Sequence, residues 1–453
     1  ERMRSLFAVL IVAVALTAMT PMPGKRTLVV LEKDSFRNTH SMFFANLESK
    51  GCTLTIVNVK DKFEISRYGE YLFDDIVIIL ESDKKYNSLS LKEFGSFIDF
   101  HGSVFVMFNG NPSDFVRNFA GYSGVEIDAA GSSVVDYFTS VDEPSNTKHT
   151  KFVTTNYARI SRMVGALAGS EGHITYRGMG MRVDPKNVLA IPVVSGDEAT
   201  TSLTEAGAPQ NHASSIVLVA AVQTRSNNRV VFAASADVFS DAYYMENPDN
   251  RVLGDQLSLW TFKFAGYLKV SNIQHYKYIR EEDRIEKEHE ILVQSVKKPN
   301  LPTSYYPEPE VAGNNVVYRI KDELYYSVNI QEFDGEEWKP YAADDVQIEF
   351  VMLDPYVRKT LSYNATSNNG DYSTIIRAPD VYGIYKFRLF YQRQGVSLIN
   401  ENTQVDIRPF KHNEFPRFIL AAYPYYTAAI VVMLGFVLFV FVFLFFGEKV
   451  KQE

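Results

Sequence analysis

The sequence predicts an α/β doubly wound domain, followed by an antiparallel β-sandwich and a single C-terminal transmembrane helix. The first half alternates short apolar runs with helical patterns, which is typical of a sheet covered by helices on both faces. Beyond residue 316 the apolar period changes to two, which indicates half-buried strands. Near the end, twenty consecutive residues carry no charge, enough for a helix to cross the hydrocarbon layer of a membrane.

The predicted α/β domain covers residues 25–279. An apolar run at Lys25–Leu31 is followed by a helical pattern at Asn38–Lys50 and a second apolar run at Thr53–Val59, which predicts a strand, a helix and a strand. Strands that are apolar on both faces are typical of a parallel sheet. Residues 124–228 are less regular, and we interpret them as strands and loops added to the same domain. The other predicted elements are strands at Asp74–Leu80, Gly102–Phe108 and Arg229–Asp237 and helices at Leu91–Phe100 and Leu253–Phe264.

A charge-rich and then proline-rich stretch predicts a linker at residues 280–315, and a β-sandwich is expected at residues 316–412. Apolar and polar residues alternate along Val346–Phe350 and Tyr385–Leu389, so one face of each strand should be buried. Asn369-Gly370 lies between two such runs and favours a tight turn between antiparallel strands.

The two ends of the chain predict its membrane topology. Residues 1–22 have the parts of a secretory signal peptide, namely a positively charged start, a short apolar core and small residues near a cleavage site. The alternative is an N-terminal anchor, for which the apolar core is short. At the other end we predict a tyrosine-rich membrane-proximal segment (413–426), a transmembrane helix (427–446) and a cytosolic tail (447–453). The chain is therefore expected to be a single-pass, type I membrane protein.

The loops after the predicted strands supply the candidate site residues, because doubly wound sheets bind ligands at the carboxyl ends of their strands. Asp34, Asn38 and His40 follow the first strand, and Asp237 ends the last one. Carboxylates near a histidine can support acid–base chemistry, and the alternative is capping and solvation of the loops. The sequence has no phosphate-binding glycine loop, nucleophile elbow or zinc-helix motif, and its single cysteine, Cys52, is interpreted as a core residue. We therefore predict no catalytic residue, no cofactor and no metal site.

Charge and short motifs add three expectations. The net charge is −8 without a long basic run, so a nucleic-acid partner is not predicted. Asn364 begins an Asn-Ala-Thr acceptor for N-glycosylation, with chance occurrence as the alternative. Lys449 and Lys451 are fifth and third from the last residue, the pattern by which coat proteins retrieve type I membrane proteins to the endoplasmic reticulum. The alternative for these lysines is contact with anionic headgroups.

Several long stretches of the chain look familiar, and they occur in order from about Arg26 to the C-terminus. The strongest, RPFKHNEFPRFILAAYPYYTAA, leads directly into the predicted transmembrane helix. The others are RTLVVLEKDSFRNTHSMFFANLESKGCTLT, YGEYLFDDIVII, YRGMGMRVDPKNVL, RVVFAASADVFSD, DDVQIEFVMLDPYVR and PDVYGIYKFRLFYQR. Together they resemble the family of non-catalytic, forty-eight-kilodalton subunits of the oligosaccharyltransferase complex.

The resemblance implies a structural subunit in the endoplasmic reticulum membrane, within the complex that transfers a preassembled glycan from dolichol diphosphate to Asn-X-Ser/Thr asparagines. It implies that the partners are the other oligosaccharyltransferase subunits, including the catalytic multi-spanning subunit, and the lipid bilayer. The family has no catalytic residues to carry over. Two alternatives stay open: a luminal hydrolase or sugar-binding protein that uses the strand-end loops, and a cell-surface adhesion receptor. The lack of a possible internal disulfide and the tail lysines argue against the receptor.

Overall fold

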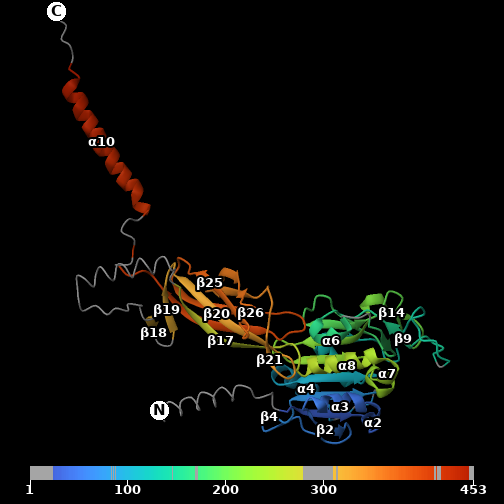
Figure 1. The fold of residues 1–453 in the computed structure, drawn as a ribbon. Coiled ribbons are helices and arrows are strands. Elements are labelled where there is room, and N and C mark those ends of the chain that lie inside the picture. Colours follow the sequence, from blue (N-terminus) through green and yellow to red (C-terminus); the bar gives the residue numbers. More distant parts are fainter. Residues whose placement is uncertain are drawn as a thin grey trace, which may run out of the picture.

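The computed structural model describes residues 24–82, 84, 86, 88–144, 146–168, 172–278, 310–312, 315–412, 415 and 420–447. The predicted signal peptide, most of the predicted linker and both tail lysines lie outside these residues. Figure 1 shows three parts: an α/β domain (24–266), a β domain (267–278 and 310–408) and the apolar helix α10 (Tyr423–Phe445). This order of parts confirms the predicted α/β domain, β-rich domain and single apolar C-terminal helix.

A mixed sheet of nine strands, counted over the described residues, forms the centre of the α/β domain. Its parallel part has the order β2-β1-β5-β6-β16, and β15, β11, β7 and β12 continue it in antiparallel pairs. The sequence predicted a parallel sheet, but the observed sheet is only partly parallel, because β15 and β16 form a hairpin that reverses the chain. The strands are β1 (Arg26–Leu31), β2 (Thr53–Asn58), β5 (Asp75–Leu80), β6 (Ser103–Phe108), β7 (Val125–Ile127), β11 (Met181–Val183), β12 (Ala190–Ser195), β15 (Val217–Gln223) and β16 (Arg229–Ala233).

Helices cover both faces of the parallel part of the sheet. Alternate residues of β1 show the division, because Val29 packs into the core beneath one pair of helices and Val30 into the core beneath the other. The first pair is α3 (Ser41–Ser49) and α8 (Pro248–Thr261), and the second is α4 (Leu91–Phe100) and α5 (Asp114–Tyr122). The smaller elements are α2 (Phe36–Thr39), β3 (Ser66–Arg67), β4 (Glu70–Tyr71), β8 (Ser133–Val135), β9 (Phe152–Thr154), α6 (Ser161–Ala168), β10 (Ile174–Tyr176), β13 (Thr201–Leu203), β14 (Pro209–His212), η1 (Ala213–Ser215), η2 (Asp237–Phe239) and α7 (Asp241–Glu246).

The β domain consists of two sheets that enclose one core. The first sheet has the order β17-β20-β25-β24 with β21 beside β20, and the second has the order β18-β19-β27-β26-β22-β23. Side chains of both sheets meet in this core; the rings of Tyr326 and Phe387, for example, have their centres 5.1 Å apart. The strands are β17 (Tyr267–Lys277), β18 (Glu310–Ala312), β19 (Asn315–Arg319), β20 (Glu323–Phe333), β21 (Trp338–Pro340), β22 (Gln347–Val351), β23 (Pro355–Thr360), β24 (Ser362–Tyr363), β25 (Asp371–Arg377), β26 (Gly383–Tyr391) and β27 (Ile399–Arg408).

Three features of the β domain differ from the sequence prediction. Strand β17 lies inside residues 25–279, yet it pairs with β20, so it belongs to the β domain. Strand β18 lies inside the stretch predicted as a linker. Strand β19 pairs with β27 in parallel, because the chain leaves β19 for the other sheet and does not return through a hairpin.

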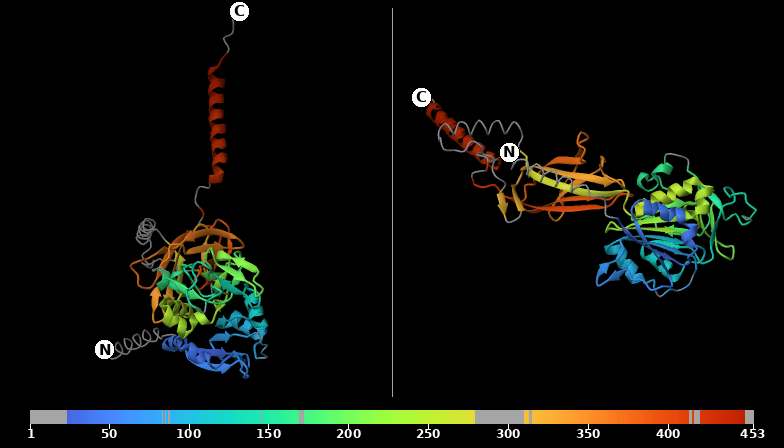
Figure 2. Two further views of the ribbon diagram at one scale, coloured as in Figure 1. Left: turned by 90° about the vertical axis from the view of Figure 1, so that its right-hand side faces the viewer. Right: turned by 60° about the horizontal axis from the view of Figure 1, so that its bottom comes forward.

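The two domains meet along a junction of side-chain-to-backbone hydrogen bonds. The loop between β26 and β27 reaches the α/β domain, where Asn227 donates to the Leu398 carbonyl at 2.8 Å and accepts from the Leu398 amide at 2.5 Å. The indole of Trp260 donates to the Gly395 carbonyl at 2.9 Å. From this junction the long strands, coloured yellow to orange in Figure 2, run outward.

Candidate functional site

The predicted strand-end residues lie at one edge of the mixed sheet, but they do not form one cluster. Asp34 is exposed and accepts a hydrogen bond from the Asn58 side chain at 3.0 Å. Asn38 is exposed on α2. His40 is buried at the start of α3, and its Nε2 lies 3.0 Å from the carbonyl oxygen of Ala236. His40 and the chain next to Asp237 are therefore brought together, whereas among the described residues no hydrogen bond or ion pair joins Asp34 or Asn38 to them.

The environment of His40 fixes its protonation. Because Nε2 faces a carbonyl oxygen, it carries the proton, and Nδ1 then accepts from the Thr39 hydroxyl at 3.0 Å. Burial lowers the pKa of the His40 imidazole, so the ring is neutral at neutral pH. Both ring nitrogens are engaged within the protein, and the ring joins the start of α3 to the segment after β16.

The acidic residues at this edge serve mainly as acceptors for the chain itself. Asp237 accepts from the Asn109 side chain at 3.2 Å. Asp241, the first residue of α7, accepts from the amides of Ser41 and Met42 at 3.0 and 2.9 Å. This carboxylate therefore caps the start of α3 from a distant part of the chain, which stabilises the positive end of the helix.

The switch point of the sheet, where nucleotide-binding folds hold their ligands, contains the chain's own carboxylate. It lies between β1 and β5, because β2 is on one side of β1 and β5 on the other. Glu32 follows β1, is 6% exposed, and accepts from the amides of Glu81 and Ser82 at 2.6 and 2.9 Å and from the Ser82 hydroxyl. Burial alone would raise the pKa of the Glu32 carboxyl, but these hydrogen bonds outweigh burial and hold its pKa below its usual range.

Glu32 was not among the predicted site residues, although the sequence contains one signal for it. An acidic residue directly after a buried strand lies at the carboxyl edge of the sheet, where free backbone amides need acceptors. The amides of Glu81 and Ser82, which could bind an anionic ligand group, are already paired with Glu32. This edge is therefore preformed around an internal anion.

A second charged cluster surrounds Lys151, which sequence reasoning also missed. Its ammonium group lies 2.6 Å from Glu143 and 2.8 Å from Glu246, and 5.3 Å from the centre of the Tyr243 ring. Although burial opposes the charge, the hydrogen bonds to the two carboxylates raise the pKa of Lys151. Burial raises the pKa of Tyr243 to about 12. A charged lysine between two carboxylates is suited to holding loops together and is a poor nucleophile.

Neither metal nor thiol chemistry has support in the part of the chain that the structure describes. Within the described residues, no three His, Cys, Asp or Glu side chains gather in an arrangement that could hold a metal ion. Cys52 is buried, and burial raises the pKa of its thiol, so little reactive thiolate forms.

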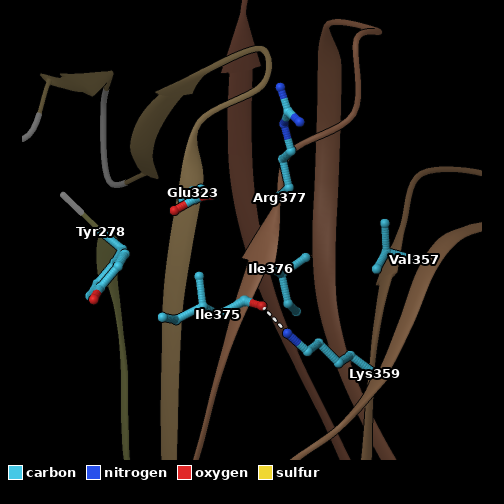
Figure 3. A pocket seen from close by; sticks show the side chains of 7 residues that line it. All are labelled: Tyr278, Glu323, Val357, Lys359, Ile375, Ile376 and Arg377. Atoms are coloured by element: carbon cyan, nitrogen blue, oxygen red, sulfur yellow. Dashed lines mark hydrogen bonds between the residues drawn. The ribbon is translucent and has the colours of Figure 1, made fainter. Parts of the chain in front are cut away.

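The β domain has a groove of about 610 Å³ at the end farthest from the domain junction. Val357, Ile375 and Ile376 make part of its lining apolar, and Lys359 donates to the Ile375 carbonyl at 2.7 Å (Figure 3). The other lining residues are Tyr278, Glu323 and Arg377. The groove is open, and its polar side chains do not converge on one point in Figure 3.

The predicted modification and membrane features are placed as follows. Asn364 is exposed, and its side-chain oxygen accepts from the Thr366 amide and hydroxyl at 3.2 and 2.5 Å. The helical segment Leu420–Phe445 has 26 residues and contains an 18-residue stretch with a mean hydropathy of 3.1. Among the described residues it is the one helix long and apolar enough to cross a membrane.

These observations define a class: a membrane protein with one described span, a two-domain extramembrane part, and buried strand-end groups that are hydrogen-bonded within the protein. The profile of the OST48 N-terminal domain matches residues 18–264, and that of the OST48 middle domain matches residues 305–447. The chain therefore belongs to the OST48 family.

Relatives named "Dolichyl-diphosphooligosaccharide--protein glycosyltransferase 48 kDa subunit" match along nearly their whole length. The protein from Arabidopsis thaliana is 32% identical over 440 residues, which cover 93% of each chain. The protein from Drosophila melanogaster is 30% identical over 445 residues, covering 93% of this chain and 92% of the relative. The protein from Danio rerio is 29% identical over 470 residues, covering 98% and 97%.

Proposed function

We propose that this chain is a non-catalytic, structural subunit of the oligosaccharyltransferase complex, which transfers a preassembled glycan from dolichol diphosphate to Asn-X-Ser/Thr asparagines in the endoplasmic reticulum lumen. One observation carries the proposal: the match to named 48 kDa subunits runs through both domains and the span, over 93% of the chain or more. The engagement of buried Glu32 and of both ring nitrogens of His40 within the protein supports the non-catalytic role, because a general base needs an accessible acceptor.

The topology follows from the same proposal. Both extramembrane domains lie in the lumen, the signal peptide having directed them there, and the C-terminal tail lies in the cytosol. In this proposal the luminal part consists of a doubly wound α/β domain followed by a β-sandwich, and each of these domains packs on other subunits of the complex. Among those partners we include the catalytic multi-spanning subunit. Helix α10 packs on partner helices through bulky side chains, since its sequence has no pair of glycines four residues apart.

Depletion and complementation test the role. Cells depleted of this protein should underglycosylate many acceptor sites, and re-expression of the full chain should restore glycosylation. The variants Asp34→Ala and Asn38→Ala should restore it equally, because both side chains are exposed and neither contributes to a core. Normal glycosylation after complete depletion would contradict the proposed function.

The same experiment addresses the alternative, a luminal hydrolase or sugar-binding protein that uses the strand-end loops. Under that alternative, Asp34→Ala and Asn38→Ala should abolish function while the protein still co-purifies with its partners in mild detergent. Co-purification separates a lost activity from a lost assembly. Full complementation by both variants would leave the alternative without its proposed residues.

A further inference from the structure

The β domain has one end that faces away from the α/β domain, and strand registers define it. Residue Glu323 of β20 is opposite Arg377 of β25, so the crossover from β25 to β26 lies at this end. Val351 is opposite Lys386, which places the β22–β23 hairpin there as well. Strand β27 leaves the domain at the same end, because its residue Ile407 pairs with Gly383. This is therefore the end from which the chain continues to α10.

Five exposed apolar side chains gather at this end, and we call them the apolar tip. Their exposed fractions are 91% for Leu353, 46% for Tyr356, 43% for Val381, 66% for Tyr382 and 58% for Ile384. A single exposed apolar side chain needs no explanation, but a contiguous group marks a surface that contacts an apolar phase or a partner.

The members of the tip come from two segments: the β22–β23 hairpin with the start of β23, and the β25–β26 crossover with the start of β26. The pairing of β22 with β26 ends at Val351 and Lys386, so the hairpin that carries Leu353 and the start of β26 that carries Ile384 lie at the same end of these two strands. The buried side chain of Tyr385 links the loops, because its ring centre lies 5.5 Å from that of Tyr356 and its hydroxyl donates to the Val381 carbonyl at 3.0 Å. The core thus holds both loops in place beneath the tip.

The tip is also close along the chain to the membrane. Strand β27 ends at Arg408 and the apolar helical segment begins at Leu420. A fully extended connection of this length spans at most about 40 Å, and any bend shortens it. A domain tethered this closely meets the bilayer at a high effective concentration, so even a weak contact is populated.

The polar groups beside the tip suit the interfacial layer of a membrane better than its hydrocarbon centre. Lys321 forms an ion pair with Asp380 at 3.0 Å next to the crossover. Asp354 lies in the hairpin beside Leu353 and is exposed. Tyrosine with aliphatic neighbours is typical of the headgroup level, where the ring is apolar and the hydroxyl stays hydrated.

We propose that the apolar tip rests in the headgroup layer of the bilayer that α10 crosses, which gives the β domain a second membrane contact besides its helix. This membrane contact goes beyond the proposed function, because it depends only on the β domain and its membrane helix and not on the other subunits of the complex. It restricts the rotation of the β domain about its tether. A partner protein is the competing occupant of this surface, and the experiment distinguishes the two.

Depth-dependent quenching by brominated lipids tests the contact in the full-length protein. The variants Leu353→Trp and Tyr382→Trp are reconstituted in phosphatidylcholine vesicles with bromines at different depths of the acyl chains. The native tryptophans, Trp260 and Trp338, lie at the domain junction and give the background of the wild-type protein. We expect both new tryptophans to be quenched by the shallow bromines, as strongly as the interfacial control Tyr426→Trp.

The matched negative control is Phe138→Trp, which is 87% exposed but belongs to the α/β domain. Tip tryptophans that are quenched no more than this control would overturn the proposal. Shielding of the tip from both bromolipid and aqueous iodide in the purified complex would also overturn it, since a protein would then cover the tip. As a second measurement, amide hydrogen exchange of residues 352–356 and 379–384 should slow at least several-fold on transfer from detergent to vesicles, and an unchanged rate would contradict the contact.

Discussion

Removal of the Glu32 carboxylate is the sharpest test of the conclusion that Glu32 occupies the switch point of the sheet. In Glu32→Ala, the amides of Glu81 and Ser82 lose a charged acceptor at 2.6 and 2.9 Å. A buried donor left unpaired costs about 1–3 kcal/mol. Both donor residues are half-buried, so water can reach part of the site, and we expect a total loss of about 2–3 kcal/mol. For a domain of this size that corresponds to a fall in Tm of roughly 4–12 °C.

The assay is thermal unfolding of the full-length protein in detergent, followed by tryptophan fluorescence. The variant Glu32→Gln keeps the shape and one neutral acceptor, so its loss should be smaller, about 1–2 kcal/mol. Formate can supply the missing carboxylate, and it should raise the Tm of Glu32→Ala more than chloride at equal ionic strength does. Wild-type protein should show no such preference, because its amides are already paired.

The pH dependence has a defined sign. Because the folded pKa of Glu32 is depressed, its stabilisation is fully present above the unfolded value of about 4.3 and is lost as the pH falls through the lower folded pKa. The difference in Tm between wild type and Glu32→Gln should therefore shrink below about pH 4. A Tm of Glu32→Ala within about 1 °C of wild type, or no formate preference, would refute the reasoning.

Three further predictions concern the junction and the two short motifs. Two hydrogen bonds of 3.0 Å between Arg162 and Glu332 join the domains. A double-mutant cycle of Arg162→Ala and Glu332→Ala should give a coupling free energy of about 1 kcal/mol in thermal unfolding, which is modest because the arginine is partly exposed. Additive effects of the two substitutions would contradict this interaction. Asn364→Gln should remove one glycan, seen as a single gel shift, and an unchanged mobility would mean that the acceptor is not used. Lys449→Ser with Lys451→Ser should loosen retention in the endoplasmic reticulum when the protein is expressed alone, measured by surface labelling; unchanged retention of the isolated chain would reject the tail signal.

The sequence predicted well those helices and strands whose bounds depend on the pattern of apolar residues within the element itself. The helix expected at Leu91–Phe100 has these bounds in the structure, and the strand expected at Asp74–Leu80 begins one residue later. Helix α8 instead begins at Pro248, five residues before the predicted Leu253. Its start is set by a cap, with Asn247 accepting from the Asp249 amide, and not by the apolar period on which the prediction relied.

Pairings between distant segments could not be predicted from the sequence. The alternation of β17 fits either domain, and its place follows only from its register with β20. The candidate site shows the same limit: the shared sheet edge places His40 near Asp237, but which atoms meet depends on the turn after β16. Glu32 was detectable as an acid after a buried strand, yet its role depends on the amides of the neighbouring β5 edge.

In the described residues the buried strand-end groups are bonded within the protein, and the proposed structural role depends instead on how the junction and the membrane end position the two domains. Domains in one chain move relative to each other unless their interface is specific, and here Asn227 pairs with both backbone groups of Leu398 while Trp260 anchors the neighbouring Gly395. Strand β20 has 11 residues and runs away from this junction, which corresponds to about 35 Å. If the apolar tip lies at the bilayer, these strands hold the α/β domain at that height above it. A substitution at the junction should then alter the position of the α/β domain without changing any group that could take part in chemistry.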